Sequence, residues 1–167
     1  MGSAITTGIG QNLAANITGR TDGLPPSAGK IGEKIAATIS TLTSITTEAD
    51  ITGASISLTA GCWRIEYSCT VQVNTGATSG NSTDGTVKIT DNSNNLVGAS
   101  ARNLRCKTVA AVAGDSIVSL SASEVVNIAA TTVYKLRALK TDGAGTGTVN
   151  VFSQAGLNST FYAVRIG

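Results

Sequence analysis

The sequence contains no histidine, and that absence excludes several kinds of chemistry at once. Histidine is the most common general base and the most common metal ligand in proteins, and its unperturbed pKa lies near neutrality. Cys62, Cys69 and Cys106 therefore lack the partner that usually generates a thiolate nucleophile. A Gly-x-Ser-x-Gly motif is also missing. We expect a protein without enzymatic activity, without a metal site and without a cofactor.

Charged side chains are scarce as well. They make up 13% of the 167 residues, with 12 basic and 10 acidic side chains and a net charge of +2. An average soluble domain carries roughly twice this charged fraction. The sequence has no cluster of lysine and arginine that would mark a surface for nucleic acid. No apolar run approaches the roughly 20 residues of a membrane span. We therefore expect neither nucleic acid nor a membrane as a partner.

The three cysteines form an odd set, and their spacing argues against a disulfide. Cys62 and Cys69 belong to one predicted strand, which would place them about 23 Å apart at about 3.3 Å per residue. A disulfide needs its two Cα atoms within about 7 Å. We expect free thiols in a protein that is made in a reducing compartment.

Residues 1–32 differ in composition from the rest of the chain. Isolated apolar residues stand among glycine, serine, threonine and asparagine, and Pro25 and Pro26 interrupt regular structure. Two interpretations are open, a disordered leader and an extended arm that becomes ordered on the surface of a partner. The arm is favoured by apolar side chains that a spacer does not need, namely Ile5, Ile9, Leu13, Ile17 and Leu24. Residues 33–167 form the predicted globular domain.

The clearest pattern in this domain is a two-residue alternation that follows the turn at 59–61. Every second residue is apolar, which is typical of a strand with one buried face. A slip of one residue would expose the single tryptophan, so the pattern determines the register. The predicted core residues of this strand include Trp63, Ile65, Tyr67 and Val71.

Shorter runs of the same character follow, separated by turns rich in glycine, asparagine and aspartate. Besides 61–73, the predicted strands are 34–45, 54–58, 86–90, 96–100, 104–112, 116–120, 124–128, 132–139, 148–152 and 160–166. About 8–10 short antiparallel strands with almost no helix predict an all-β sandwich or jelly roll.

Several of these strands are apolar on both faces. Such strands in a small domain indicate that one sheet packs against another subunit. The candidate residues for an interface between copies are Val126, Val133, Phe161 and Tyr162. The pattern predicts a homo-oligomer and leaves its symmetry open.

Four segments of the domain resemble the structural proteins of tailed-bacteriophage virions. The segment 56–65 is similar to their "is-L-ta-G-x-W-x-i" motif, and Gly32-Glu33-Lys34-Ile35 is similar to their opening "GE-x-i". The closing strands of these proteins resemble 133–138 and 159–166. Cys62 stands where an acidic residue is usual, and Phe161 and Tyr162 replace a run of small residues.

The resemblance implies a jelly roll like the heads of complement and tumour-necrosis-factor proteins, which are usually trimeric. It also implies a capsid decoration or cement protein, made in the bacterial host cytoplasm and bound to the outer surface of the virion. Its partners would be the major capsid protein and further copies of itself. The alternative is a head-fibre or tail-fibre tip that binds a host receptor or glycan. The loops at 74–85 and 142–147 contain no aromatic residue, which argues against stacking on a sugar.

Overall fold

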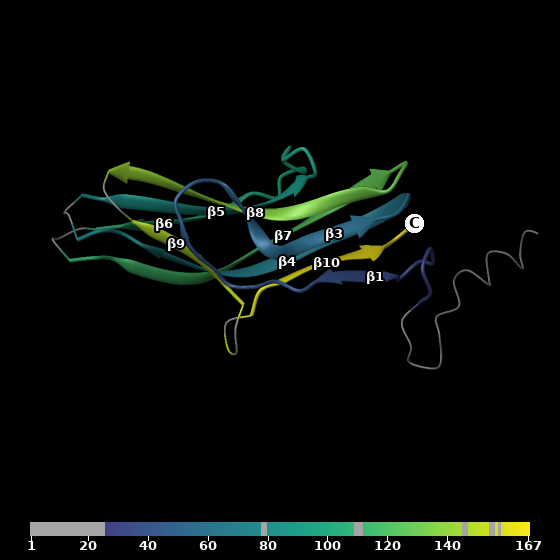
Figure 1. The fold of residues 1–167 in the computed structure, drawn as a ribbon, viewed down its shortest axis with the longest axis horizontal. Coiled ribbons are helices and arrows are strands. Elements are labelled where there is room, and N and C mark those ends of the chain that lie inside the picture. Colours follow the sequence, from purple (N-terminus) through teal and green to yellow (C-terminus); the bar gives the residue numbers. More distant parts are fainter. Residues whose placement is uncertain (1–25, 78–79, 109–111, 145–146, 154–155, 157) are drawn as a thin grey trace, which may run out of the picture.

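The predicted all-β sandwich is confirmed. A computed structural model of the chain describes residues 26–77, 80–108, 112–144, 147–153, 156 and 158–167. Within these ranges the chain forms strands and turns and no helix, and two antiparallel sheets pack face to face along the length of the molecule (Figure 1). No helix in the described ranges is therefore long and apolar enough to cross a membrane.

Ten strands make up the two sheets in the described part of the chain. They are β1 (Lys34–Ala37), β2 (Leu42–Ile45), β3 (Ala49–Leu58), β4 (Gly61–Asn74), β5 (Ser82–Asp91), β6 (Arg102–Lys107), β7 (Asp115–Ile128), β8 (Thr132–Ala144), β9 (Thr148–Phe152) and β10 (Thr160–Arg165). The first sheet has the order β1-β10-β4-β9-β2, and β7 pairs with the other edge of β4. The second sheet has the order β3-β8-β5-β6.

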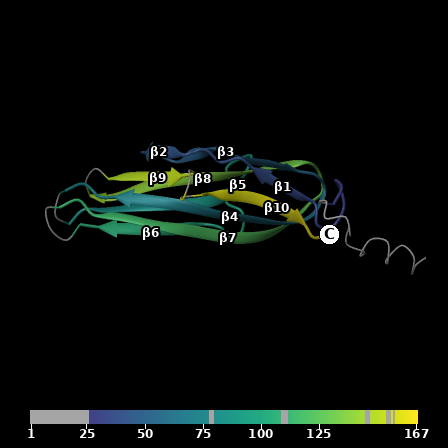
Figure 2. The ribbon, with the colours of Figure 1, turned by 90° about the horizontal axis from the view of Figure 1, so that it is seen from below.

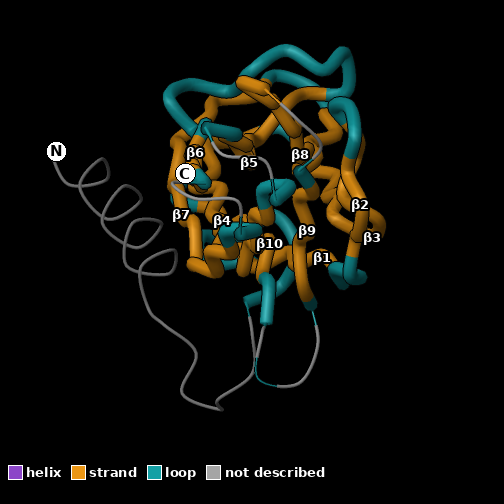
Figure 3. Tube along the Cα trace, turned by 90° about the vertical axis from the view of Figure 1, so that its left-hand side faces the viewer, coloured by secondary structure: helices purple, strands orange, loops and turns teal. Residues whose placement is uncertain are grey.

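Strands that follow each other in sequence often lie in different sheets, which is the connectivity of a jelly roll. Four strands of the first sheet, β7-β4-β10-β1, face the four strands of the second sheet (Figure 2). The short strands β2 and β9 extend the first sheet beside the far half of β4. Seen from the end, the strands surround a closed interior (Figure 3).

The core lies between the sheets and is made mainly of aliphatic side chains. On β4, Trp63, Ile65 and Val71 are completely buried and Tyr67 is 2% exposed, on the face that the alternation predicts. The opposing sheet contributes its own buried side chains, including Val87, Ile89, Leu136 and Ala138. The Tyr67 hydroxyl oxygen lies 2.9 Å from the backbone oxygens of both Val87 and Ser100 and can donate its one proton to either, so the buried polar end of this side chain is satisfied.

The prediction that Phe161 lies at an interface between copies is wrong. Phe161 pairs with Tyr67 across β10 and β4, and residues directly opposite each other in a sheet point to the same face. Tyr67 points into the core, and Phe161 does too, with 1% of its surface exposed.

Four predicted strands also differ from the structure. The predicted strands 116–120 and 124–128 are one continuous strand, β7, because the small residues between them pair with β4. The predicted strand 34–45 is divided into β1 and β2. The segment 96–100 is a loop that has only one isolated bridge, between Leu96 and Thr90.

Candidate interaction surface

The outer face of the first sheet is the strongest candidate for a functional surface. Cross-strand neighbours on β7, β4, β10 and β1 share this face, because opposite residues in a sheet point the same way. Three rows of neighbours cross the strands in that order. The first row is Val125, Arg64, Val164 and Lys34, and the second is Ser123, Glu66, Tyr162 and Ala36. The third row is Ser121, Ser68 and Thr160.

A shallow hollow of about 400 Å³ lies in the middle of this face. Its floor is made of small hydroxyl side chains, Ser68, Ser121 and Ser123, on β4 and β7. Tyr162 and Glu66 are among the residues that line it. The hollow exists because short side chains stand beside a large ring, so the face offers a concave surface with hydroxyl groups.

The Glu66 carboxylate is the centre of a polar network on this face. Glu66 accepts a hydrogen bond from the Tyr162 hydroxyl, and its Oε1 atom is 2.7 Å from Arg64 Nε. Ser123 donates to the same Oε1 atom at 3.4 Å, and Lys34 Nζ lies 4.3 Å from the centre of the Tyr162 ring. The hydrogen bond to Glu66, with partial burial, raises the pKa of Tyr162 above its usual value. Tyr162 therefore remains a hydrogen-bond donor, and its ring lies beneath the Lys34 ammonium group.

Exposed aliphatic side chains are concentrated on β7, at the edge of this face. Ile117 is 50% exposed, Val118 36% and Val125 58%. None of the three was among the residues expected at an interface. The pairing of β7 with β4 turns Ile117 and Val125 away from the core, whereas Val118 is opposite the buried Val71 and is on the core side of the sheet. A local sequence pattern does not reveal this pairing partner, since it is about fifty residues away in the chain.

The remaining predicted interface residues are separated by the fold. Val126 pairs with Trp63 and faces the core, where it is half-buried. Val133 pairs with Ser57 on the outer side of the second sheet. Only Tyr162 lies on the candidate surface. The predicted arm residues Ile5, Ile9, Leu13, Ile17 and Leu24 lie outside the described residues.

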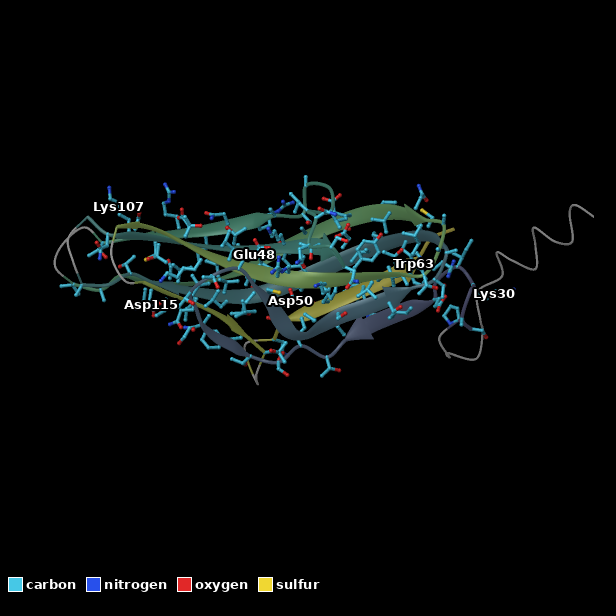
Figure 4. The ribbon with its side chains drawn as sticks, turned by 45° about the horizontal axis from the view of Figure 1, so that its top comes forward. Lys30, Glu48, Asp50, Trp63, Lys107 and Asp115 are labelled. Atoms are coloured by element: carbon cyan, nitrogen blue, oxygen red, sulfur yellow. The ribbon has the colours of Figure 1, made fainter. Side chains whose placement is uncertain are left out.

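The outer face of the second sheet has a different character, because it carries a network of ion pairs. Asp50 binds Lys135 at 3.0 Å and Arg137 at 2.7 Å, and Glu48 contacts Lys88 at 3.0 Å and also Arg137. Partial burial raises the pKa of Asp50, but hydrogen bonds from Lys135 and Arg137 outweigh it and hold that pKa below its usual range. Figure 4 shows Glu48 and Asp50 near the middle of the molecule. Covering this network with a partner would remove several charges from water, which is costly.

The residues of the phage-like motifs meet at one end of the sandwich. The Arg165 guanidinium stacks 4.4 Å from the centre of the Trp63 ring, and Nε lies 3.1 Å from the Glu33 carboxylate. Its Nη1 atom donates to the Ala60 oxygen at 2.8 Å. Gly61 has a φ of +143°, and a Cβ atom there would lie 2.0 Å from Arg165 Nη1. These motif residues join the first and last segments of the described domain to β4.

The three cysteines are free thiols, as their spacing in the sequence predicts. Cys62 is half-buried, whereas Cys69 and Cys106 are buried. Burial raises the pKa of Cys69 to about 12, so its thiol stays protonated at neutral pH. In the described part of the chain, no three acidic or cysteine side chains come together in a way that could hold a metal ion.

Comparisons with known proteins give limited information about this chain. No protein-family model matches the sequence, and neither does any curated protein. Among solved structures, that of the infectious bursal disease virus Gt strain has a TM-score of 0.33 and 11% identity, covering 90% of this chain and 42% of that one. The VP2 subviral particle of the same virus has a TM-score of 0.30 and 13% identity, covering 90% and 41%. The chain spans about two fifths of their length, and the likeness concerns the β-sandwich alone.

Proposed function

We propose that the protein is a non-enzymatic structural component of a virion. In this proposal it is a decoration or cement protein of a bacteriophage, which binds the outer surface of the capsid and bridges neighbouring capsid subunits. Its partners are the major capsid protein and further copies of itself. The observation that carries the proposal is the contrast between the two outer faces. One face is covered by a network of ion pairs, whereas the other exposes aliphatic side chains beside serine hydroxyls and the single ion pair of Arg64 with Glu66.

The entry of the chain into the sandwich supports a role for the preceding segment as a capsid-binding arm. Gly32 donates to the Arg165 backbone oxygen at 2.8 Å, and Glu33 accepts from Arg165 through both its backbone and its side chain. The chain is therefore fixed at the point where the expected arm of residues 1–32 joins the domain. An arm that becomes ordered on a capsid can then transmit load directly to the core. Repetition of such contacts over a shell gives high avidity from weak individual contacts.

Deletion of residues 1–31 tests the arm. Gly32 and Glu33 remain, so the contacts with Arg165 are kept and the domain should stay folded. We expect the shortened protein to show an unchanged circular-dichroism spectrum and to lose binding to capsids that lack the decoration. The measurement is co-sedimentation with such capsids, followed by cryo-electron microscopy of the particles.

A full-length control separates the chemistry of the arm from its length. In this variant Ile5, Ile9, Leu13, Ile17 and Leu24 are all replaced by serine, and it should also fail to bind capsids.

Full occupancy of the capsid by the shortened protein would overturn the role of the arm. Binding to host cells, with no binding to capsids, would instead favour a fibre tip. Hydrolytic turnover that disappears when a single carboxylate is replaced would overturn the non-enzymatic proposal.

A further inference from the structure

The outer edge of β7 is long and lacks the usual protection of an edge strand. In the described part of the chain, β7 pairs only with β4, and the 14 residue pairs between them continue without a bulge. Proteins normally protect such edges with proline, lysine, a bulge or a covering segment. The strand has the sequence DSIVSLSASEVVNI, which contains no proline, glycine, lysine or arginine. A row of backbone groups at this edge is therefore available to another strand.

The two acidic residues of β7 do not protect its edge either. Asp115 is at the beginning of the strand and accepts a hydrogen bond from Gln72 Nε2 at 2.9 Å. Glu124 is opposite Ile65, on the core side of the sheet, and accepts from the Ala99 backbone nitrogen at 2.8 Å. Both carboxylates are thus engaged within the same copy. Along the middle of the strand the outward side chains are serines, with Ile117 and Val125 on either side of them.

We propose that β7 pairs with β7 of a second copy of this chain, antiparallel, about a two-fold axis at Ser121. A two-fold axis perpendicular to the sheet keeps the outer faces of both copies on the same side. In this register Ile117 of each copy lies opposite Val125 of the other. Ser119 lies opposite Ser123, and Asp115 opposite Asn127, so no charge faces a like charge. The two most exposed aliphatic residues of the strand then form two cross-strand pairs, which stabilise a sheet.

The neighbouring registers lack this complementarity. Centring the axis on Leu120 places Asp115 opposite Val125 and leaves Ile117 opposite Ser123. Centring it on Ala122 places Ile117 opposite Asn127 and leaves Val125 opposite Ser119. Only the axis at Ser121 covers both aliphatic side chains with aliphatic partners, so the side chains of β7 specify a single register.

The contact would join the first sheets of two copies into one continuous sheet. The hydroxyl-lined hollows beside Ser121 and Ser123 in both copies would adjoin across the axis. A two-fold contact gives two copies in solution, whereas the resemblance to phage proteins implies three. The pairing does not depend on which capsid the protein binds, so a measurement of mass tests it separately from the proposed function.

Sedimentation velocity of the full-length chain tests the pairing. We expect the wild type to approach the mass of two chains as its concentration increases. Ser121→Lys would place two ammonium groups next to each other on the axis, and we expect the dissociation constant to rise at least about tenfold. The matched control is Ser57→Lys, since Ser57 is exposed on β3, an edge strand of the second sheet. That control should dimerise like the wild type.

Mixing two variants provides the decisive measurement. Ser121→Lys and Ser121→Glu should each be monomeric, and their mixture should form a mixed dimer, because opposite charges then meet on the axis. The circular-dichroism spectra of both variants should match that of the wild type, since Ser121 is exposed. A wild-type monomer at all concentrations, a three-chain mass that Ser121→Lys leaves unchanged, or a mixture that stays monomeric would overturn the proposal.

Discussion

Trp63 is the largest side chain that the sandwich encloses completely. Its indole nitrogen donates to the Thr59 oxygen at 2.9 Å, and Arg165 covers one face of its ring. We expect Trp63→Ala to reduce the free energy of unfolding by about 3–5 kcal/mol, because the substitution leaves a cavity that the surrounding strands cannot fill. Urea denaturation followed by circular dichroism measures this loss. Leu96→Ala, which shortens a 49% exposed side chain, should change stability by about 0.5 kcal/mol or less. Equal effects of the two substitutions would contradict the enclosed position of Trp63.

Arg165 is a buried cation, with 6% of its surface exposed. Replacement by methionine keeps much of the contact with Trp63 but leaves the Glu33 carboxylate without its cation. Breaking a buried pair in this way costs about 3–5 kcal/mol. We therefore expect Arg165→Met to lower the denaturation midpoint strongly. The control is Arg105→Met, since the Arg105 side chain is 67% exposed in its pair with Asp84. This control should lower the midpoint only slightly, and a similar loss in both variants would show that burial does not determine the strength of these pairs.

At the scale of the strands, the pair between β5 and β6 makes stability depend on pH. Asp84 lies opposite Arg105, and the hydrogen bonds from Arg105 hold the pKa of Asp84 below its usual value. A carboxylate with a lowered pKa stabilises the folded state above its unfolded pKa of about 3.9, and that contribution is lost as the pH falls through the folded pKa. Asp84→Asn should therefore lose less stability than the wild type between neutral pH and about pH 3. Denaturation curves measured over this pH range test the difference, and parallel losses in the two proteins would refute it.

The strands that could be predicted from the sequence are those with a regular local pattern. The alternation of β4 determines its buried face because one side of the strand carries nearly all of its apolar residues. β7 was predicted as two strands because Ser121, Ala122 and Ser123 resemble a turn locally. In the structure they continue the strand, since they lie opposite Ser68, Tyr67 and Glu66. Pairing along a neighbouring strand thus overrode local composition.

The segment 96–100 shows the opposite effect, because an apolar run there does not form a strand. Asp91 Oδ1 accepts from the backbone nitrogens of Ser93 and Asn95, which closes a turn directly after β5. Ser100 then exchanges hydrogen bonds with the backbone of Ile89. The side chains of Asp91 and Ser100 thus make hydrogen bonds with backbone groups that a neighbouring strand would otherwise bind. The asparagine-rich sequence indicated the turn, but nothing in it indicated the contact between Ser100 and Ile89.

At the scale of the whole molecule, the sequence predicted the sandwich but not the character of its two faces. Which apolar residues reach the surface depends on pairs such as Val125 with Arg64 and Tyr162 with Glu66. The ion pairs of the other face join Glu48 and Asp50 to residues that follow them by up to about ninety positions. Contacts between residues this far apart in the chain produce no periodic pattern in a single sequence. The candidate surface therefore became visible only with the sheet registers.

The position of β10 has a consequence for how the molecule is made. This strand is the last of the ten to be synthesised, yet it lies between β1, the first, and β4. While residues 160–165 are still inside the ribosome, β1 has no neighbour in its sheet and Arg165 cannot close over Trp63. A polypeptide released before Thr160 would keep two bare sheet edges, which favour aggregation. Only a chain that includes this late strand can therefore join β1 to β4 and cover Trp63 with Arg165.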